Sequence, residues 1–222
     1  SVADFEDGAG GPPSRLRRPE AVADEIAALY HLQQVRLFLV QDDVFIQPSR
    51  ELALERLTEL VGLLAERDVD RASFWAKARP DALHDEVVEA ARALGVIHLF
   101  LGVESDVPER LAYLGRSHTP ADNRRAIDAC LEHGIRPSFN LVLFDPECAL
   151  EEVEAGLALA ARNVDLQWNL CRAEVYSGTP MHRRLLAEGR LTGDYRGYGY
   201  RIRDERAELL RRVLAISFKE RC

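Results

Sequence analysis

Residues 96–105 read VIHLFLGVES, and this stretch decides the fold. Side chains alternate between the two faces of a strand, so each face can be read separately. One face is wholly apolar: Ile97, Leu99, Leu101 and Val103. The other face is mixed: His98, Phe100, Gly102 and Glu104. The stretch therefore predicts a strand that buries one face under helices and turns the other face toward a ligand cavity.

Similar strands recur along the chain and alternate with helices. Further strands are predicted at Val35–Val40, Phe74–Ala78, Ser138–Phe144 and Leu166–Val175. Helices are predicted at Glu20–His31, Ser49–Glu66, Asp81–Leu94, Pro120–His133 and Ala149–Arg162. This alternation predicts an α/β fold with a parallel sheet, either closed as a barrel or doubly wound. The tail from Met181 to Cys222 predicts helices with a Gly- and Tyr-rich interruption at Gly193–Tyr200.

The second face of the other predicted strands is polar as well. Its polar members are Lys77, Arg79, Ser138, Asn140, Gln167 and Asn169. Burying such a group without a partner costs roughly 2–7 kcal/mol, so a dry core of these residues is disfavoured. We interpret this face as the lining of a cavity for a polar ligand. A core network of mutually hydrogen-bonded polar groups is the alternative.

Composition excludes several classes of protein. Hydrophobic residues make up 47% of the 222 residues and charged residues 30%, as in a globular protein. The net charge of −8 argues against nucleic-acid binding, which depends on a basic surface. No apolar run approaches the ~18 residues of a membrane span, and the first residues carry no signal-peptide pattern. The four scattered cysteines favour reduced thiols in the cytoplasm.

Ligands of parallel α/β folds bind at the carboxyl ends of the strands, and a carboxylate falls at one of these ends. Glu104 shares its face with Gly102, which leaves the backbone bare. A carboxylate at such a place suits a ribose diol, because it accepts hydrogen bonds from both hydroxyls. The alternative is that Glu104 caps the helix that starts near Val107.

Other charged candidates fall at the ends of the two preceding strands. Asp42 and Asp43 suit a cation or a ligand amine, or they terminate the strand in a turn. Arg79 suits a ligand carboxylate, or it forms a structural ion pair with Asp81 or Glu104.

Lys77 supports a different hypothesis. A desolvated lysine on a barrel strand can attack a carbonyl group, as in a Schiff-base aldolase or lyase. The structural interpretation is that Lys77 pairs with a carboxylate. His98 fits a hydrogen-bonded core histidine better than a metal ligand, since no second histidine stands at ligand spacing.

The order of several short motifs resembles a known family. These motifs are Arg18–Ile26 (RPEAVADEI), Phe38–Phe45 (FLVQDDVF), Ala78–Leu83 (ARPDAL), Leu101–Ser105 (LGVES) and Val175–Met181 (VYSGTPM) with Glu188–Leu191 (EGRL). In this order they resemble the cobalamin-binding branch of the radical S-adenosylmethionine (SAM) superfamily. Each motif alone is unspecific, whereas the ordered set spans most of the chain.

The resemblance implies a partial, TIM-like (βα)6 barrel whose first strand is missing, over residues 1–180, followed by a helical extension over residues 181–222. It implies a 4Fe–4S cluster and SAM, which together generate a 5′-deoxyadenosyl radical, and an unknown small-molecule substrate. It also implies a cobalamin-binding domain in the parent chain, with cobalamin-assisted methyl transfer as a second outcome.

Residue roles follow from the same resemblance. Glu104 is expected to hold the SAM ribose with support from Ser105, and Asp42 to stand near the methionine amine. The remaining SAM contacts are expected at Gly102, Arg79 and Asn140. Side chains lining the substrate or cofactor are expected to be Asn169, Tyr176 and Gln167.

The chain departs from the family pattern at two places. No Cys-x-x-x-Cys-x-x-Cys motif occurs, so the chain supplies no metal ligands and the cluster cysteines are expected upstream of Ser1. The fragment alone is therefore expected to be inactive. Phe144 and Asp145 stand where relatives carry glycine. Besides the Lys77 aldolase or lyase, a non-catalytic barrel that binds a nucleoside or a partner protein is the remaining alternative.

Overall fold

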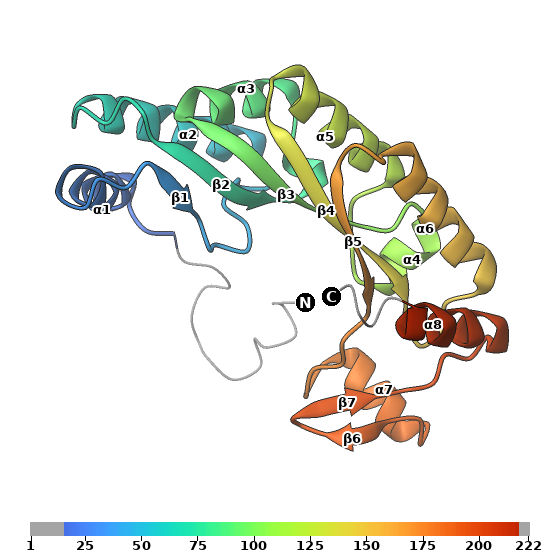
Figure 1. Ribbon diagram of the computed structural model, residues 1–222. Coiled ribbons are helices and arrows are strands. Elements are labelled where there is room, and N and C mark those ends of the chain that lie inside the picture. The colour runs from blue at the N-terminus through green and yellow to red at the C-terminus, as the bar shows by residue number, and fades with distance from the viewer. Residues whose placement is uncertain (1–15, 218–222) are drawn as a thin grey trace.

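Five parallel strands form a single curled sheet in the computed structural model, which describes residues 16–217. The strands are β1 (Leu37–Leu39), β2 (Ser73–Ala78), β3 (Val96–Glu104), β4 (Arg136–Phe144) and β5 (Gln167–Arg172), and they lie side by side in this order. The sheet arches without closing, so it is half of a barrel (Figure 1). The predicted partial TIM-like barrel is thereby confirmed.

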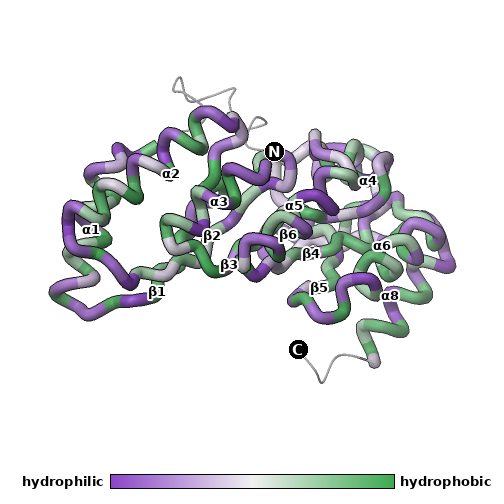
Figure 2. The backbone as a smooth tube through the Cα atoms, turned by 90° about the horizontal axis from the view of Figure 1, so that it is seen from above, coloured by the Kyte–Doolittle hydropathy of each residue, from purple (hydrophilic) through white to green (hydrophobic). Residues whose placement is uncertain are grey.

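Helices cover the outer, convex side of this sheet (Figure 1). They are α1 (Pro19–Leu32), α2 (Arg50–Ala65), α3 (Asp85–Leu94), the short α4 (Pro108–Tyr113), α5 (Pro120–Glu132) and α6 (Leu150–Arg162). Seen from above, α1 and α2 lie side by side at one end of the molecule, and α6 and the C-terminal helix α8 (Glu205–Ser217) lie at the other (Figure 2). No helix of residues 16–217 combines the length and hydropathy that crossing a bilayer requires.

The core lies between the sheet and these helices. Leu99, Leu101 and Val103 of β3 are fully buried, as are Phe139 and Leu141 of β4. Each such side chain contributes about 1.5–3 kcal/mol when it leaves water, so the apolar faces read from the sequence hold the two layers together. Ile97 is the exception, because it is 41% exposed. The register of β2 against β3 shifts near the start of both strands, and this shift takes Ile97 out of the layer.

The concave face encloses a space that we call the hollow. Most of its side chains are half-buried or exposed, as a ligand-facing surface requires, whereas Ser138 is buried. The face is less uniformly polar than predicted, since Leu39, Trp75 and Phe100 line an apolar cavity of about 360 Å³ over β1–β3. Glu104, Asn140 and Asn169 form a polar group toward the carboxyl ends of β3–β5. The hollow therefore has an apolar part and a polar part.

The helix predicted at Asp81–Leu94 is divided in two. A single 3-10 turn spans Pro80–Ala82, and α3 starts only at Asp85, after His84 in extended conformation. Gly95 ends α3 in the left-handed region with φ 100°. A Cβ at Gly95 would lie 2.5 Å from the carbonyl oxygen of Ala72, so glycine is required both by its conformation and by this close approach.

The C-terminal part packs against the end of the sheet. It contains α7 (Pro180–Ala187), an antiparallel hairpin of β6 (Thr192–Asp194) and β7 (Gly197–Gly199), and α8 (Glu205–Ser217). The predicted interruption is therefore a hairpin. The hydroxyl of buried Tyr200 donates to the carbonyl of Ala173 at 2.8 Å, which ties the hairpin to the segment after β5. A division of the chain after residue 180 stays a prediction, and residues 1–15 and 218–222 lie outside the described part.

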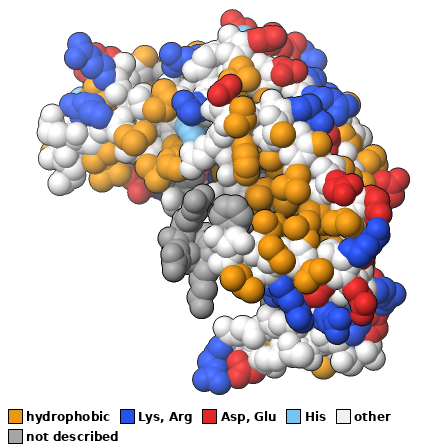
Figure 3. All heavy atoms as spheres, turned by 45° about the vertical axis from the view of Figure 1, so that its right-hand side comes forward, with side chains coloured by type: hydrophobic (Ala, Val, Ile, Leu, Met, Phe, Trp, Pro, Cys, Tyr) orange, Lys and Arg blue, Asp and Glu red, His pale blue; other side chains and the backbone are white. Residues whose placement is uncertain are grey.

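Hydrophobic side chains also reach the surface near the edge of the sheet. In the space-filling view of Figure 3 they gather in one band at the height of β5, above the part formed by α7 and the hairpin. Strand β5 is an edge strand, and its Leu170 is 41% exposed, although the sequence pattern placed this residue on the buried face. An edge strand lacks a neighbour on one side, which is why its apolar face is only partly covered.

Candidate functional site

The carboxyl end of β3 holds Glu104 in an uncommon backbone conformation. Its φ is 61°, in the left-handed region that non-glycine residues rarely adopt. The register against β4 also shifts between Leu101 and Glu104, as at a bulge. Such strain costs of order 1–3 kcal/mol and persists only where the surrounding structure imposes it. The strain marks Glu104 as a candidate functional residue.

The bulge brings the carboxylate of Glu104 back over Gly102. A Cβ built on Gly102 would lie 3.8 Å from Oε1 of Glu104 and meet no other atom within 4 Å. Gly102 therefore exposes bare backbone on the concave face, beside a carboxylate. The two residues form an open cradle in which a ligand can contact the main chain and the acid together, so the prediction that pairs them is supported by their geometry.

The structure adds Arg116, a residue that sequence reasoning missed. Its Nη2 donates to Oε1 of Glu104 at 2.7 Å, and the Glu104 side chain is 15% exposed while that of Arg116 is 48% exposed. Arg116 lies in the loop between α4 and α5, which returns to the same edge of the sheet. The only signal in the sequence is a basic residue after Gly115 in this loop, and that signal is weak.

Ser105 supports the cradle from behind. It is only 7% exposed. Its Oγ accepts a hydrogen bond from the amide of Val107 at 3.1 Å, and its carbonyl accepts one from Nδ2 of the fully buried Asn123 at 2.9 Å. Ser105 therefore holds the loop that carries Glu104 and does not present its hydroxyl to the hollow.

Two amides stand beside the cradle on the neighbouring strands. Asn140 of β4 and Asn169 of β5 are paired in register, and Nδ2 of Asn169 donates to Oδ1 of Asn140 at 3.2 Å. Asn140 is half-buried and Asn169 exposed, so both amides keep donors and acceptors for a ligand. Gln167 is also exposed, but it lies opposite Ser138, nearer the amino ends of the strands.

His98 lies lower on the same concave face and acts as a structural residue. Its Nε2 is hydrogen-bonded to Oγ of Ser138 at 2.6 Å, and its ring packs 4.6 Å from that of Trp75. Burial lowers the pKa of His98, and the charge of Arg136 lowers it further. A neutral, hydrogen-bonded ring agrees with the interpretation as a core histidine.

Arg79 is bound within its own loop. Its guanidinium donates to both carboxylate oxygens of Asp81, at 2.9 and 2.6 Å, and to Ser117. The hydrogen bonds from Arg79 lower the pKa of Asp81, and Asp81 raises the pKa of Arg79. The structure thus shows the ion pair between Arg79 and Asp81, which was the alternative to a contact between Arg79 and a ligand carboxylate.

Lys77 forms an exposed ion pair. Its Nζ lies 3.3 Å from Oδ1 of Asp43, with side-chain exposures of 37% and 92%. A Schiff-base lysine needs a dry pocket to lose its proton. The exposed pair provides no such pocket, so the structure favours the interpretation of Lys77 as an ion-pair partner.

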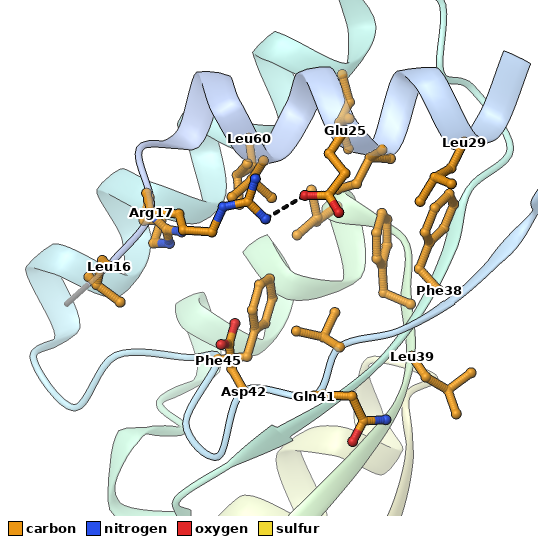
Figure 4. A pocket seen from close by; sticks show the side chains of 17 residues that line it. Leu16, Arg17, Glu25, Leu29, Phe38, Leu39, Gln41, Asp42, Phe45 and Leu60 are labelled. Carbon is orange, nitrogen blue, oxygen red and sulfur yellow. Dashed lines mark hydrogen bonds and ion pairs between the residues drawn. The ribbon is translucent and has the colours of Figure 1, made fainter. Parts of the chain in front are cut away.

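Asp42 is placed at a separate cavity. This cavity of about 530 Å³ lies between α1, β1 and α2, and its walls are largely apolar (Figure 4). Arg17 and Glu25 are joined across it by an ion pair, and Asp42 stands beside Phe45 at its lower side (Figure 4). No described contact joins Asp42 to Glu104, so the structure does not bring these two predicted residues together.

Tyr176 also lies apart from the cradle, beyond the end of β5. It is 62% exposed, and its hydroxyl donates to Glu174. It lines a third cavity, which the hairpin closes on the other side.

The three cysteines within residues 16–217 do not form a metal site. Burial raises the pKa of Cys130 to about 12 and that of Cys148 to about 11, so both remain protonated thiols. Cys171 is half-buried, and its pKa is raised as well. Among residues 16–217 no three His, Cys, Asp or Glu side chains gather at ligand distance. The described residues therefore do not fit an iron–sulfur cluster.

These observations define a class of protein: an open parallel α/β half-barrel with a ligand cradle at the carboxyl ends of its strands. A family comparison then identifies it, since the model of the radical SAM superfamily matches residues 4–155. The chain belongs to the radical SAM superfamily. The expected family is confirmed, and SAM and the cluster are cofactors of that family.

Relatives agree with this family. An uncharacterized methyltransferase of Pyrococcus horikoshii is 24% identical over 181 residues, which are 81% of this chain and 38% of that protein. The solved structure of the cobalamin-dependent SAM radical enzyme OxsB has a TM-score of 0.75 at 16% identity, over 90% of this chain and 36% of that chain. The radical SAM methyltransferase TsrM from Kitasatospora setae has a TM-score of 0.66 at 23% identity, over 78% and 32%.

These relatives are much longer than the chain. It spans 38% of the length of the curated relative and about a third of the two solved chains. At these identities the structural likeness shows the fold alone.

Proposed function

We propose that the chain is the SAM-binding core of a cobalamin-dependent radical SAM enzyme that acts on a small molecule. The observation that carries this proposal is the cradle of Glu104 and Gly102, held in a strained bulge at the edge of the hollow. The printed names of OxsB and TsrM, a cobalamin-dependent radical enzyme and a methyltransferase, support the branch. The reducing cytoplasm is the compartment that we propose for it.

Each residue of the cradle has a distinct task. Glu104 accepts hydrogen bonds from the two ribose hydroxyls, because an ionised carboxylate offers several acceptor sites. Arg116 holds the carboxylate in place through a hydrogen bond of 2.7 Å. Gly102 lets the nucleoside approach the backbone, and Asn140 and Asn169 offer amide donors and acceptors beside it.

SAM bound beside a reduced cluster supplies a 5′-deoxyadenosyl radical, and with cobalamin it supplies a methyl group. We propose that the ligands of the cluster and of cobalamin lie outside residues 16–217, since the described cysteines do not fit a cluster. Asp42, Arg79 and Tyr176 remain proposed contacts of SAM or substrate, although Arg79 must first leave Asp81.

The proposal is tested by SAM binding to the 222-residue chain and its variants, measured by equilibrium dialysis with radiolabelled SAM. Glu104→Gln keeps the shape but loses the charge, and we expect SAM affinity to fall at least about tenfold, since hydrogen bonds to charged groups contribute roughly 1.5–3 kcal/mol. The matched control is Glu86→Gln, which removes a carboxylate paired with Arg50 on the outer surface. Equal affinity in both variants contradicts the proposal.

A further inference from the structure

The third cavity, which Tyr176 lines, lies at the carboxyl end of β5. It has a volume of about 600 Å³ and lies between two segments: Cys171–Tyr176, where β5 ends, and Tyr195–Tyr198, the turn and first part of β7. We call it the hairpin cavity. In Figure 1 the hairpin lies beneath the carboxyl end of β5, at the open side of the half-barrel. The cavity therefore lies at the carboxyl ends of the strands, where the ligands of parallel α/β folds bind.

Tyrosines dominate its wall. Tyr176 is 62% exposed and Tyr195 is 80% exposed. Tyr198 is held in place, since its hydroxyl is hydrogen-bonded to Oγ of Ser177 at 2.9 Å and its ring packs edge-on against His182 at 4.9 Å. Tyrosine rings present large flat apolar faces, and they stack with other rings at a gain of about 0.5–1.5 kcal/mol each. A wall with two exposed tyrosines and one fixed tyrosine suits a flat ring.

The cationic groups of the cavity are already engaged. The guanidinium of Arg172 lies 3.8 Å from the ring centre of Tyr200 and donates to the Tyr200 carbonyl. Arg196 is bound to Asp194 through Nη2 at 2.8 Å and Nε at 3.3 Å. Each arginine therefore already has a partner, while Nε of Arg172 has none among the described residues.

Hydrogen-bond acceptors, in contrast, remain free at the end of the cavity formed by Cys171 and Glu174, which we call its inner end. Glu174 accepts only the hydroxyl of Tyr176 among the described contacts, which leaves most of its acceptor sites open. The charges of Glu104 and Glu174 both raise the pKa of Cys171, whose side chain lines the cavity at this end. The inner end is therefore negative and rich in acceptors, and it favours a ligand group that donates hydrogen bonds.

Cys171 also connects the hairpin cavity to the hollow. It lines the cavity, and it is the partner of Val142 on the concave face of the sheet. The charge of Glu104 is close enough to perturb its thiol. A ligand that stacks on the tyrosines thus points its inner edge toward the cradle.

We propose that the hairpin cavity is the substrate site, and that the substrate is a flat, conjugated ring bearing a hydrogen-bond donor that points to Glu174. The assignment to a substrate rests on the proposed function, whereas the class of ligand rests on the cavity alone. The hairpin is then the part of the chain that selects the substrate.

The test uses 3-fluorotyrosine incorporated into the whole chain, whose six tyrosines give separate fluorine NMR signals. The probe is indole, a flat ring with one N–H donor. We expect indole to shift the signals of Tyr176, Tyr195 and Tyr198 and to leave those of Tyr30 and Tyr113 unchanged. Cyclohexanol, a saturated ring with a donor, and benzoate, a flat anion, are expected to bind at least about threefold more weakly, since each lacks one of the two contacts.

Variants sharpen the result. Tyr195→Ala removes an exposed ring in a turn, and we expect indole affinity to fall roughly three- to tenfold, the equivalent of one aromatic contact. Tyr30→Phe is the matched control, because Tyr30 donates to Asp70 at the far end of the molecule. The inference is overturned if no signal shifts up to the solubility of indole, if all six signals shift alike, or if cyclohexanol or benzoate binds as tightly as indole.

Radiolabelled SAM separates this inference from the proposed function. We expect Tyr195→Ala to bind indole more weakly but SAM unchanged, and Glu104→Gln to bind SAM more weakly but indole unchanged. If the chain binds indole at these tyrosines while Glu104→Gln binds SAM as well as the unaltered chain does, the ring class is confirmed and the assignment to a radical SAM substrate is overturned.

Discussion

Two neighbouring strands end in a carboxylate, and their surroundings are opposite. Glu104 follows a register shift in β3, and Asp145 follows one at the end of β4. The Glu104 side chain is 15% exposed at the hollow and has one exposed arginine as its partner. The Asp145 side chain is 1% exposed and binds Arg110, itself 15% exposed, at 3.1 Å, while it also accepts the amide of Glu147 at 2.8 Å.

This difference separates an acid that is free to bind from an acid that holds the fold. The Asp145 carboxylate binds Arg110 of α4 and the amide of Glu147 in the loop before α6, and Arg110 also reaches Glu152 of α6 at 2.9 Å. Glu104 has its oxygen atoms over bare backbone. Phe144 and Asp145 are bulkier than the glycines expected at these positions. Asp145 is turned into the interior, so its charge does not enter the hollow.

The largest effect is expected from breaking the interior pair. Arg110→Ala leaves the buried carboxylate of Asp145 and the half-buried carboxylate of Glu152 without this cation, and we expect the free energy of unfolding to fall by about 3–5 kcal/mol. Urea unfolding measures this change. For comparison, Arg116→Ala should change the free energy of unfolding by less than about 1 kcal/mol, because its pair with Glu104 is partly exposed. Similar losses in both variants would refute the contrast between the two carboxylates.

An intermediate effect is expected from filling the cradle. Gly102→Val places a side chain where only Oε1 of Glu104 lies within 4 Å, so we expect the fold to remain and SAM affinity to fall at least about tenfold, or 1.4 kcal/mol. Equilibrium dialysis measures the affinity, and circular dichroism checks the fold. Gly62→Ala on α2 is the control, since its Cβ position is equally open but lies on the outer layer. Unchanged SAM affinity in Gly102→Val would show that the cradle is not the nucleoside site.

The smallest effect concerns the thiol between the cradle and the hairpin cavity. Burial raises the pKa of Cys171, and the charges of Glu104 and Glu174 raise it further. Glu104→Gln removes one negative charge, so the thiolate becomes easier to form and the pKa of Cys171 falls. We expect the pH profile of its alkylation by iodoacetamide to move to lower pH, followed by mass spectrometry of the labelled peptide. Glu86→Gln should leave the profile in place, and an unmoved profile in Glu104→Gln would place the carboxylate away from Cys171.

Local patterns predicted the layers of the fold well. Leu99, Leu101 and Val103 are buried as their alternation indicates, because that alternation is a property of extended backbone and holds wherever one face is covered. The alternation fails for Ile97, which lies where the register shifts, and for Leu170, which lies on the edge strand. Both side chains are 41% exposed. The Gly- and Tyr-rich stretch at Gly193–Tyr200 was correctly separated from its helices, but its hairpin pairing was not predicted.

The candidate site was predicted only in part. Gly102 and Glu104 stand two residues apart on one strand, so their proximity follows from sequence. Arg116 is twelve residues away along a loop, and no local pattern places it beside Glu104. Arg79 and Asp42 were grouped with the cradle by their places at strand ends and by the family resemblance. The structure binds Arg79 to Asp81 and places Asp42 at another cavity.

By itself, the sequence determined the half-barrel, its family and the carboxylate at the end of β3. These features depend on periodicity and on short motifs, both of which act between residues close along the chain. Only the tertiary structure decided that Glu104 faces the hollow while Asp145 is buried, and that tyrosines from two distant segments share one cavity. Such features depend on register shifts and on contacts between residues far apart in the chain, which the packing of the whole molecule selects.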